Sequence, residues 1–144
     1  MTGAVVTNAL SKRYGANTAL APLTLSVGAG EVFGLIGPNG AGKTTFMRLL
    51  LDIIRPTGGS ARVLGEDPRR GGAPLRRRVG YLPGELRLES RARAGELLEH
   101  YARISGPVRP GATERLAERL QLDLGQQVGK LSKGNKQKVG LVQA

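Results

Sequence analysis

Residues 37–45 read Gly37-Pro38-Asn39-Gly40-Ala41-Gly42-Lys43-Thr44-Thr45 and fit the pattern G-x-x-x-x-G-K-[ST]. An apolar segment of strand type, residues 32–36, precedes this run, and an apolar segment of helix type, residues 46–51, follows it. Strand, glycine-rich loop and helix in this order are the context in which the pattern marks a phosphate-binding loop. The sequence therefore predicts such a loop here, and we consider a chance match to a glycine-rich turn the weaker alternative.

The residue types in this loop suit a bound polyphosphate. Gly37, Gly40 and Gly42 lack a Cβ atom, so the backbone can turn with positive φ and bring consecutive N–H groups against an anion. The helix that follows begins with unpaired N–H donors and a partial positive charge. Lys43 adds a full positive charge on the outer phosphates, and the Thr44 hydroxyl is a ligand for Mg²⁺. The pattern therefore predicts a nucleoside triphosphate with Mg²⁺ as the ligand.

Length and composition limit the class of protein. The 144 residues are enough for one domain with a hydrophobic core. Apolar residues make up 40% but aromatic residues only 3%, so the core must consist of Leu, Val, Ile and Ala. The absence of cysteine excludes disulfides and thiolate metal sites, and is compatible with the cytosol. We find no signal peptide and no apolar run near the roughly twenty residues of a membrane span.

The chain is strongly basic, with a formal net charge of +11. Its arginines cluster at residues 69–70, at residues 76–78, and at positions 87, 91 and 93. Such a charge indicates either an anionic partner or an arginine-rich solvated surface, and we favour the second reading. Because no aromatic residues are interleaved with the arginines, the stacking platforms of single-strand binders are not expected.

The first half of the chain predicts strands around one helix. Alternating apolar residues from Ala4 to Val27 predict antiparallel strands with a turn at Tyr14–Asn17. The continuous apolar run Glu31–Ile36 predicts a buried parallel strand, and the helix after the loop should end near residues 52–54. Further predictions are short strands at 61–64 and 79–82 and a short basic helix at 74–78.

The second half predicts helices. One helix follows Ser90, and Pro107 and Pro110 separate it from a second helix at Thr113–Leu122, with Thr113 as the N-cap. A last helix begins near Ser132. The side chains predicted to face inward are Leu97, Leu98, Tyr101, Ile104, Leu116, Leu120 and Leu122.

Four segments together resemble the ATP-binding subunit of an ABC transporter, over essentially the whole chain. They are residues 12–15 around Tyr14, residues 30–45 with the phosphate loop, residues 79–83 before the family's glutamine loop, and the signature-like residues 131–137. The resemblance implies an α/β P-loop NTPase fold of the ABC type, with the C-terminal part of the core sheet missing. It divides the chain into an antiparallel β subdomain (1–30), a P-loop core (31–85), a helical subdomain (86–131) and a signature helix (132–144). The variants are most similar to exporters whose membrane partner is of the ABC-2 type.

The resemblance also implies roles for individual residues. Tyr14 would stack on adenine, residues 37–45 would hold the phosphates and Mg²⁺, and Ser132 with Gly134 would contact the γ-phosphate across a head-to-tail homodimer. A membrane-spanning subunit would be the partner, with the chain at the cytoplasmic face of the membrane. From the residues alone, Tyr14 also fits an ordinary turn tyrosine, and Ser132 also fits the N-cap of a plain surface helix.

Three features depart from the family pattern. Gly84 and Glu85 stand where the glutamine is expected, so we hypothesise that the Glu85 carboxylate replaces it. Lys133 at a helix N-terminus opposes the helix dipole unless an anion arrives there. The apolar strand ending in Asp-Glu is not found after the signature, and neither Asp123 nor the lone His100 replaces it. We therefore expect no catalytic residue in this chain, ATP binding without fast turnover, and marginal stability.

The function expected is ATP binding, with hydrolysis in the complete protein powering transport across a membrane. One alternative is a soluble ABC-type ATPase that acts on the ribosome or on nucleic acid, which we consider less favoured. Another is a non-catalytic nucleotide-binding fragment. A small-molecule kinase is disfavoured because strands precede the phosphate loop and nothing resembles a substrate lid.

Overall fold

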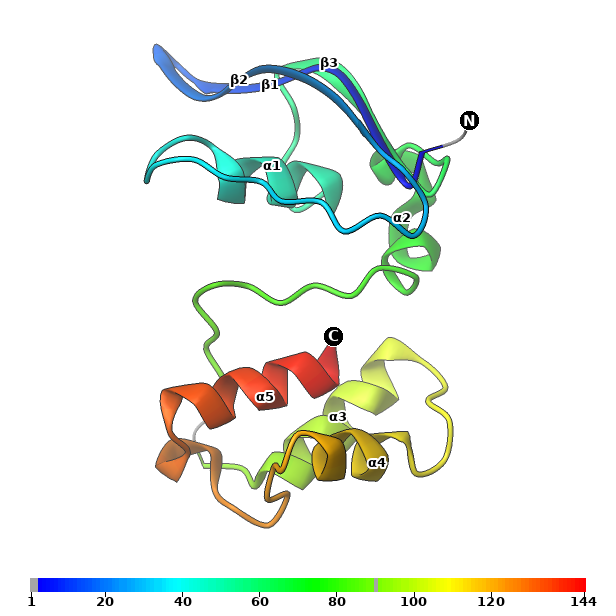
Figure 1. Cartoon of the computed structure of the whole chain (residues 1–144), viewed down its shortest axis with the longest axis vertical. Coiled ribbons are helices and arrows are strands. Elements are labelled where there is room, and N and C mark those ends of the chain that lie inside the picture. Colours follow the sequence, from blue (N-terminus) through cyan, green and yellow to red (C-terminus); the bar gives the residue numbers. More distant parts are fainter. Residues whose placement is uncertain (1–2, 90) are drawn as a thin grey trace. The chain divides into compact units, whose positions relative to one another are not determined.

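The computed structural model describes residues 3–89 and 91–144. It divides into two compact units, which are described separately (Figure 1): a first unit up to Arg78 and a second unit from Val79 to Ala144.

The first unit is built on a three-stranded antiparallel sheet. Strands β1 (Val5–Tyr14) and β2 (Asn17–Val27) form a hairpin, and β3 (Gly58–Val63) pairs with the other edge of β1, which gives the order β2-β1-β3. The hairpin and its turn at Tyr14–Asn17 confirm the prediction from alternation. The strand expected at 61–64 begins earlier, because its pairing with β1 already starts at Gly58.

Two helices accompany this sheet. Helix α1 (Lys43–Leu50) lies along one face of it (Figure 1), where Phe46 and Leu49 pack with Leu10 and Leu20 to form the core. Helix α2 (Pro68–Arg76) begins six residues before the predicted basic helix, because Asp67 caps it and Pro68 occupies its first turn. The helix is kinked at Gly72, whose φ is +53°.

The prediction of a buried parallel strand at Glu31–Ile36 is wrong. This segment has no regular secondary structure; Val32 is 100% exposed and Ile36 is 95% exposed, and only Leu35 packs against the core. A buried strand needs ladder partners for its N–H and C=O groups, and no described strand pairs with this segment. The strand predicted at 79–82 is absent from the described structure for the same reason.

The second unit is helical. It contains α3 (Ala94–Ser105), α4 (Ala112–Arg119), the short 3₁₀ helix η1 (Val128–Lys130) and α5 (Lys133–Gln143). Helices α3 and α4 both pack against α5. The core that they enclose consists of Ala94, Leu97, Leu98, Ala117, Leu122, Val128, Leu131 and Val139.

Three details of the predicted helices are corrected. Ile104 is 65% exposed, because it lies in the last turn of α3 beyond the residues that reach the core. Leu116 is 41% exposed, and the buried residue of α4 is its neighbour Ala117, whose small side chain permits close helix packing. Gly111, not Thr113, is the N-cap, because the helix already begins at Ala112.

Candidate phosphate-binding site

The phosphate loop adopts the backbone conformation that its glycines permit. Gly40 has a φ of +86° and Gly42 a φ of +90°, a region that residues with a Cβ atom rarely adopt. Gly42 is the N-cap of α1; no side chain caps this helix, and its first turn contains no acidic residue. The first N–H groups of a helix have no intrahelical partner. No carboxylate of the first turn therefore competes with an incoming anion at this positive helix end.

Lys43 lies folded over the loop that precedes it. Its Nζ donates hydrogen bonds to the carbonyl oxygens of Gly37, at 2.5 Å, and Pro38, at 2.7 Å. An ammonium group has three donors, so one remains for a ligand. The two bonds fix the charge beside the loop rather than leaving it in solvent.

The end of the loop is seated closely against strand β2. A Cβ atom at Gly42 would lie 2.7 Å from the carbonyl oxygen of Ala19 and 3.0 Å from Cδ1 of Leu20. A Cβ atom at Gly40 would meet nothing within 4 Å. Gly42 is therefore needed for packing as well as for its φ, whereas Gly40 is needed only for its φ.

A cavity of about 470 Å³ lies between the loop and the hairpin. Its wall contains Asn39, Gly40, Ala41, Gly42, Lys43, Thr44 and Thr45 from the loop and α1, and Asn17, Thr18 and Ala19 from the start of β2. The structure thus brings residues 39–45 of the predicted loop together around one space, while Gly37 and Pro38 lie outside its wall and hold the Lys43 ammonium. Sequence reasoning missed residues 17–19, because only the packing of the hairpin against the loop brings them into the wall.

Tyr14 lies at the turn of the hairpin, next to this cavity but outside its lining. It is 54% exposed, and its ladder partner Asn17 belongs to the cavity wall. The Lys12 ammonium lies 4.6 Å from the centroid of the tyrosine ring, within cation–π distance. The Lys12 ammonium thus lies over one face of the ring.

Thr44 is the residue of this cavity suited to Mg²⁺. Proteins commonly hold Mg²⁺ through one or two carboxylates while substrate phosphates and water complete the shell. Among the described residues no carboxylate lines this cavity; Thr44 is exposed and belongs to its wall, and a hydroxyl at this position of the loop pattern is a ligand for Mg²⁺. Within residues 3–89 and 91–144, His, Asp and Glu side chains form no group of three that could bind a metal by themselves.

The other predicted site residues belong to the second unit. Ser132 caps α5, as predicted, because its Oγ accepts a hydrogen bond from the Asn135 N–H at 3.2 Å. Gly134 lies in the first turn, where the nearest atom to a hypothetical Cβ is the Ser132 Oγ at 4.0 Å. His100 is exposed and contacts the ring of Tyr101.

Glu85 borders a different cavity, of about 360 Å³. It shares this wall with Gly84, Leu86, Lys133, Lys136 and Gln137. The other charged residues of this wall, Lys133 and Lys136 of α5, are both basic. Sequence reasoning missed this proximity, because the residues lie about fifty positions apart.

In the described part of the chain, no helix combines the length and the apolar character needed to cross a bilayer.

Comparison with known proteins agrees with this architecture. The family model described as "ABC transporter" matches residues 20–144. A probable multidrug ABC transporter ATP-binding protein, YbhF of Escherichia coli, is 42% identical over 98% of this chain and 26% of its own length. The bacitracin transport ATP-binding protein BcrA of Bacillus licheniformis is 34% identical over the whole of this chain and 48% of its own length. The daunorubicin resistance ATP-binding protein DrrA2 of Streptomyces coeruleorubidus is 40% identical over 96% of this chain and 44% of its own length.

Solved structures show the same fold. An ATP-binding subunit of an ABC transporter superposes with a TM-score of 0.83 and 31% identity, over 97% of this chain and 60% of the other. A putative ABC transporter ATP-binding protein from Pyrococcus furiosus gives a TM-score of 0.81 at 25% identity, over 96% of this chain and 68% of the other. The chain spans between about a quarter and a half of the length of the curated relatives described above. The expected α/β fold of the ABC type is thereby confirmed, and the chain belongs to the ABC transporter family.

Proposed function

We propose that this chain binds Mg²⁺-ATP at the loop Gly37–Thr45, and that the complete protein hydrolyses ATP to drive transport across a membrane. The observation that carries the proposal is the position of Lys43, whose ammonium is held over the loop by the carbonyls of Gly37 and Pro38. It borders a cavity in which the start of α1 faces no capping side chain. A fixed positive charge, an open helix start and glycines with positive φ are what a triphosphate tail requires.

Each group has one task in this binding mode. The loop amides and Lys43 hold the β- and γ-phosphates, and the Thr44 hydroxyl ligates the metal. When bound, Mg²⁺ supplies charge neutralisation between the phosphates. Tyr14 stacks on the adenine with the ring face that points away from Lys12. Its pairing with Asn17, a residue of the cavity wall, supports this role.

We further propose a head-to-tail homodimer in which Ser132 and Gly134 of one subunit contact the γ-phosphate held by the other. The exposed Lys133 and Gly134 in the first turn of α5 support this role, because a cation and a residue without a side chain at a helix start suit an anion. The relatives compared above are named as ATP-binding proteins of a probable multidrug ABC transporter, of bacitracin transport and of daunorubicin resistance. An exporter with a membrane-spanning partner, and a place at the cytoplasmic face of the membrane, is therefore the class we propose.

Hydrolysis needs a carboxylate that polarises the attacking water. No acidic residue borders the loop cavity among the described residues. We therefore assign ATP binding to this chain and expect little turnover from it alone. Glu85 stays a hypothesis for the role of the missing glutamine: Glu85→Ala in the complete protein should lower Mg²⁺-dependent ATP turnover, and unchanged turnover would remove it from the site.

The experiment that tests the proposal is a calorimetric titration with ATP, ADP and AMP in the presence of Mg²⁺. If the loop holds the outer phosphates, affinity falls with each phosphate removed, because charge-assisted hydrogen bonds are lost. Thr44→Ala should reduce the Mg²⁺-dependent part of the ATP affinity, while AMP binding stays unchanged. Equal affinity for ATP and AMP would contradict the proposal.

A further inference from the structure

A second cavity of the first unit, of about 260 Å³, is lined mainly by arginines. Its wall consists of Arg55, Asp67, Arg69 and Arg70, and it shares no residue with the cavity of the phosphate loop. Three arginines thus line a small space together with a single acidic residue. Like charges gathered around one space repel each other unless an anion lies between them.

The carboxylate of Asp67 is already engaged in capping α2. Its Oδ1 accepts a hydrogen bond from the Arg69 N–H at 2.9 Å, and its carbonyl oxygen accepts from the N–H groups of Arg70 and Gly71 at 2.9 and 2.8 Å. The protein itself therefore uses these amides of α2. Any anion attracted to the cavity is attracted by the arginine side chains.

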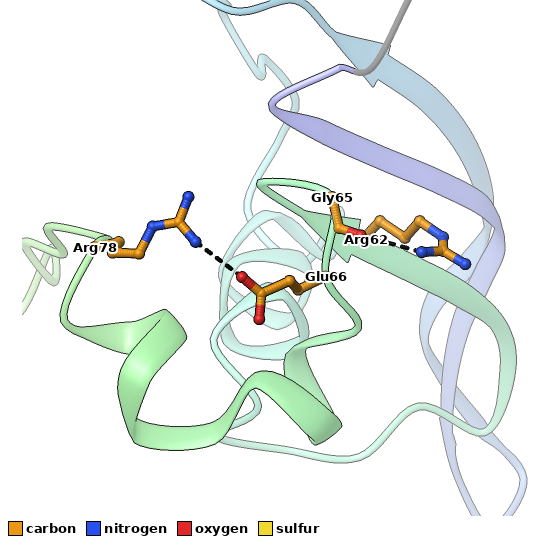
Figure 2. Close-up of polar contacts among 4 residues, drawn as sticks. All are labelled: Arg62, Gly65, Glu66 and Arg78. Carbon is orange, nitrogen blue, oxygen red and sulfur yellow. Dashed lines mark hydrogen bonds and ion pairs between the residues drawn. The ribbon is translucent and has the colours of Figure 1, made fainter.

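These arginines differ from others in the same unit. Figure 2 shows Arg78 paired with Glu66 at 2.8 Å and Arg62 donating to the Gly65 carbonyl at 3.0 Å. Within the described residues, by contrast, Arg69 and Arg70 take part in no ion pair.

Arg55 is only loosely paired. Its Nε lies 3.4 Å from Oδ1 of Asp52, and that oxygen has no hydrogen-bond partner among the described residues. Arg55 and Asp52 thus form an ion pair but no hydrogen bond through these two atoms. Because residues 1–78 carry eleven Lys and Arg against four Asp and Glu, the rest of the unit does not neutralise the cavity.

An adjoining cavity of about 200 Å³ shares Asp67 and Arg69 with the arginine-lined one. Most of its wall is apolar, and the residues are Leu10, Leu49, Pro56, Gly59, Ser60, Ala61 and Pro68. A charged space that continues into an apolar one fits a ligand with an anionic head and an apolar substituent.

We propose that these two cavities form a binding site for an organic phosphate. Arg55, Arg69 and Arg70 hold the phosphate, because the planar guanidinium fork matches its oxygens in bidentate fashion. The apolar substituent lies in the adjoining cavity. The shared chemistry is that of a phosphate ester, either a soluble one or the headgroup of a phosphatidic-acid-type lipid.

The test is a calorimetric titration with hexyl phosphate as the probe. It uses the chain with Lys43→Ala, which removes the phosphate-binding ammonium group of the loop and so weakens competing binding there. The double variant Arg69→Ala/Arg70→Ala should weaken binding at least about tenfold, since the charge-assisted hydrogen bonds of two guanidinium groups are lost. The matched control Arg76→Ala/Arg77→Ala removes the same charge from exposed positions of the same unit, outside the cavity, and should leave binding unchanged. Equal affinities in the two double variants would overturn the proposal.

Two further arms identify the ligand. Inorganic phosphate should bind more weakly than hexyl phosphate, and equal affinity would overturn the role of the apolar cavity. Flotation with phosphatidylcholine vesicles, with and without phosphatidic acid, separates the sources. Arginine-dependent binding to the acidic vesicles assigns a lipid, and hexyl phosphate binding without vesicle binding assigns a soluble ester. Binding of neither probe refutes the site.

Discussion

Alanine substitutions at two glycines of the phosphate loop separate backbone strain from close packing. Gly40 and Gly42 have nearly the same positive φ, so an alanine at either position should lose about 1–2 kcal/mol to the left-handed conformation. Only at Gly42 would the new Cβ lie 2.7 Å from the Ala19 carbonyl of β2, closer than real Cβ contacts. Forced overpacking adds about 1–3 kcal/mol. The expected loss in unfolding free energy is therefore about 2–5 kcal/mol for Gly42→Ala and about 1–2 kcal/mol for Gly40→Ala.

The assay is urea denaturation followed by far-ultraviolet circular dichroism, with both variants and the parent measured under one condition. The quantity of interest is the difference between the two variants, because the strain common to both cancels in it. Hydrogen exchange of the β2 amides provides a local readout, and these amides should lose protection in Gly42→Ala alone. Equal losses of stability in the two variants would refute the packing of the loop end against β2.

Three further predictions concern the second unit and the hairpin. Ser132→Ala should lower the unfolding free energy of the helical unit by about 1 kcal/mol through loss of the α5 cap, whereas Ser132→Asp should retain stability in the same denaturation assay; equal stability of all three proteins would argue against the cap. Leu98→Ala should cost about 2–5 kcal/mol because the side chain is buried, while Ile104→Ala should stay within about 0.5 kcal/mol, and a reversal of this order in urea melts would contradict the core assignment. Tyr14→Ala should weaken binding of a fluorescent adenine nucleotide about tenfold and Tyr14→Phe should not, since stacking on an aromatic ring contributes about 1–3 kcal/mol; unchanged affinity in Tyr14→Ala would exclude the stacking role.

Local signals in the sequence predict the local elements well. The hairpin follows from alternating apolar residues and a turn at Tyr14–Asn17, both of which lie within a few residues of one another. The start of α5 follows from Ser132, because a serine hydroxyl satisfies an orphan N–H group at a helix start. The helix after the phosphate loop is likewise found at Lys43–Leu50.

Features that depend on distant partners could not be predicted. The apolar run Glu31–Ile36 has the composition of a buried strand, yet strand formation depends on neighbours that no local pattern specifies. The buried face of α4 was misassigned because Ala117, rather than the larger Leu116, packs against the core. Helical spacing identifies an apolar face but does not say which of two adjacent apolar residues reaches the neighbouring helix.

The candidate site divides in the same way. The motif singled out the loop residues that line the cavity, because glycine, lysine and threonine at fixed spacing have a direct chemical reason. Residues 17–19 complete the wall only through tertiary packing of the hairpin on the loop. The arginine-lined cavity is a similar case, since Arg69 and Arg70 are adjacent in the chain but Arg55 joins them only through the fold.

The most direct test of the account is the affinity of the chain for a fluorescent ATP analogue, measured with Lys43→Ala beside the parent. The Lys43 ammonium borders the cavity with a donor to spare, so its removal should weaken binding at least about tenfold, the effect of losing a hydrogen bond to a charged group. Lys130→Ala, an exposed lysine at the end of η1, serves as the control for loss of one charge and should bind as the parent does. Equal affinity of the parent and Lys43→Ala would contradict the claim that this loop is a triphosphate site.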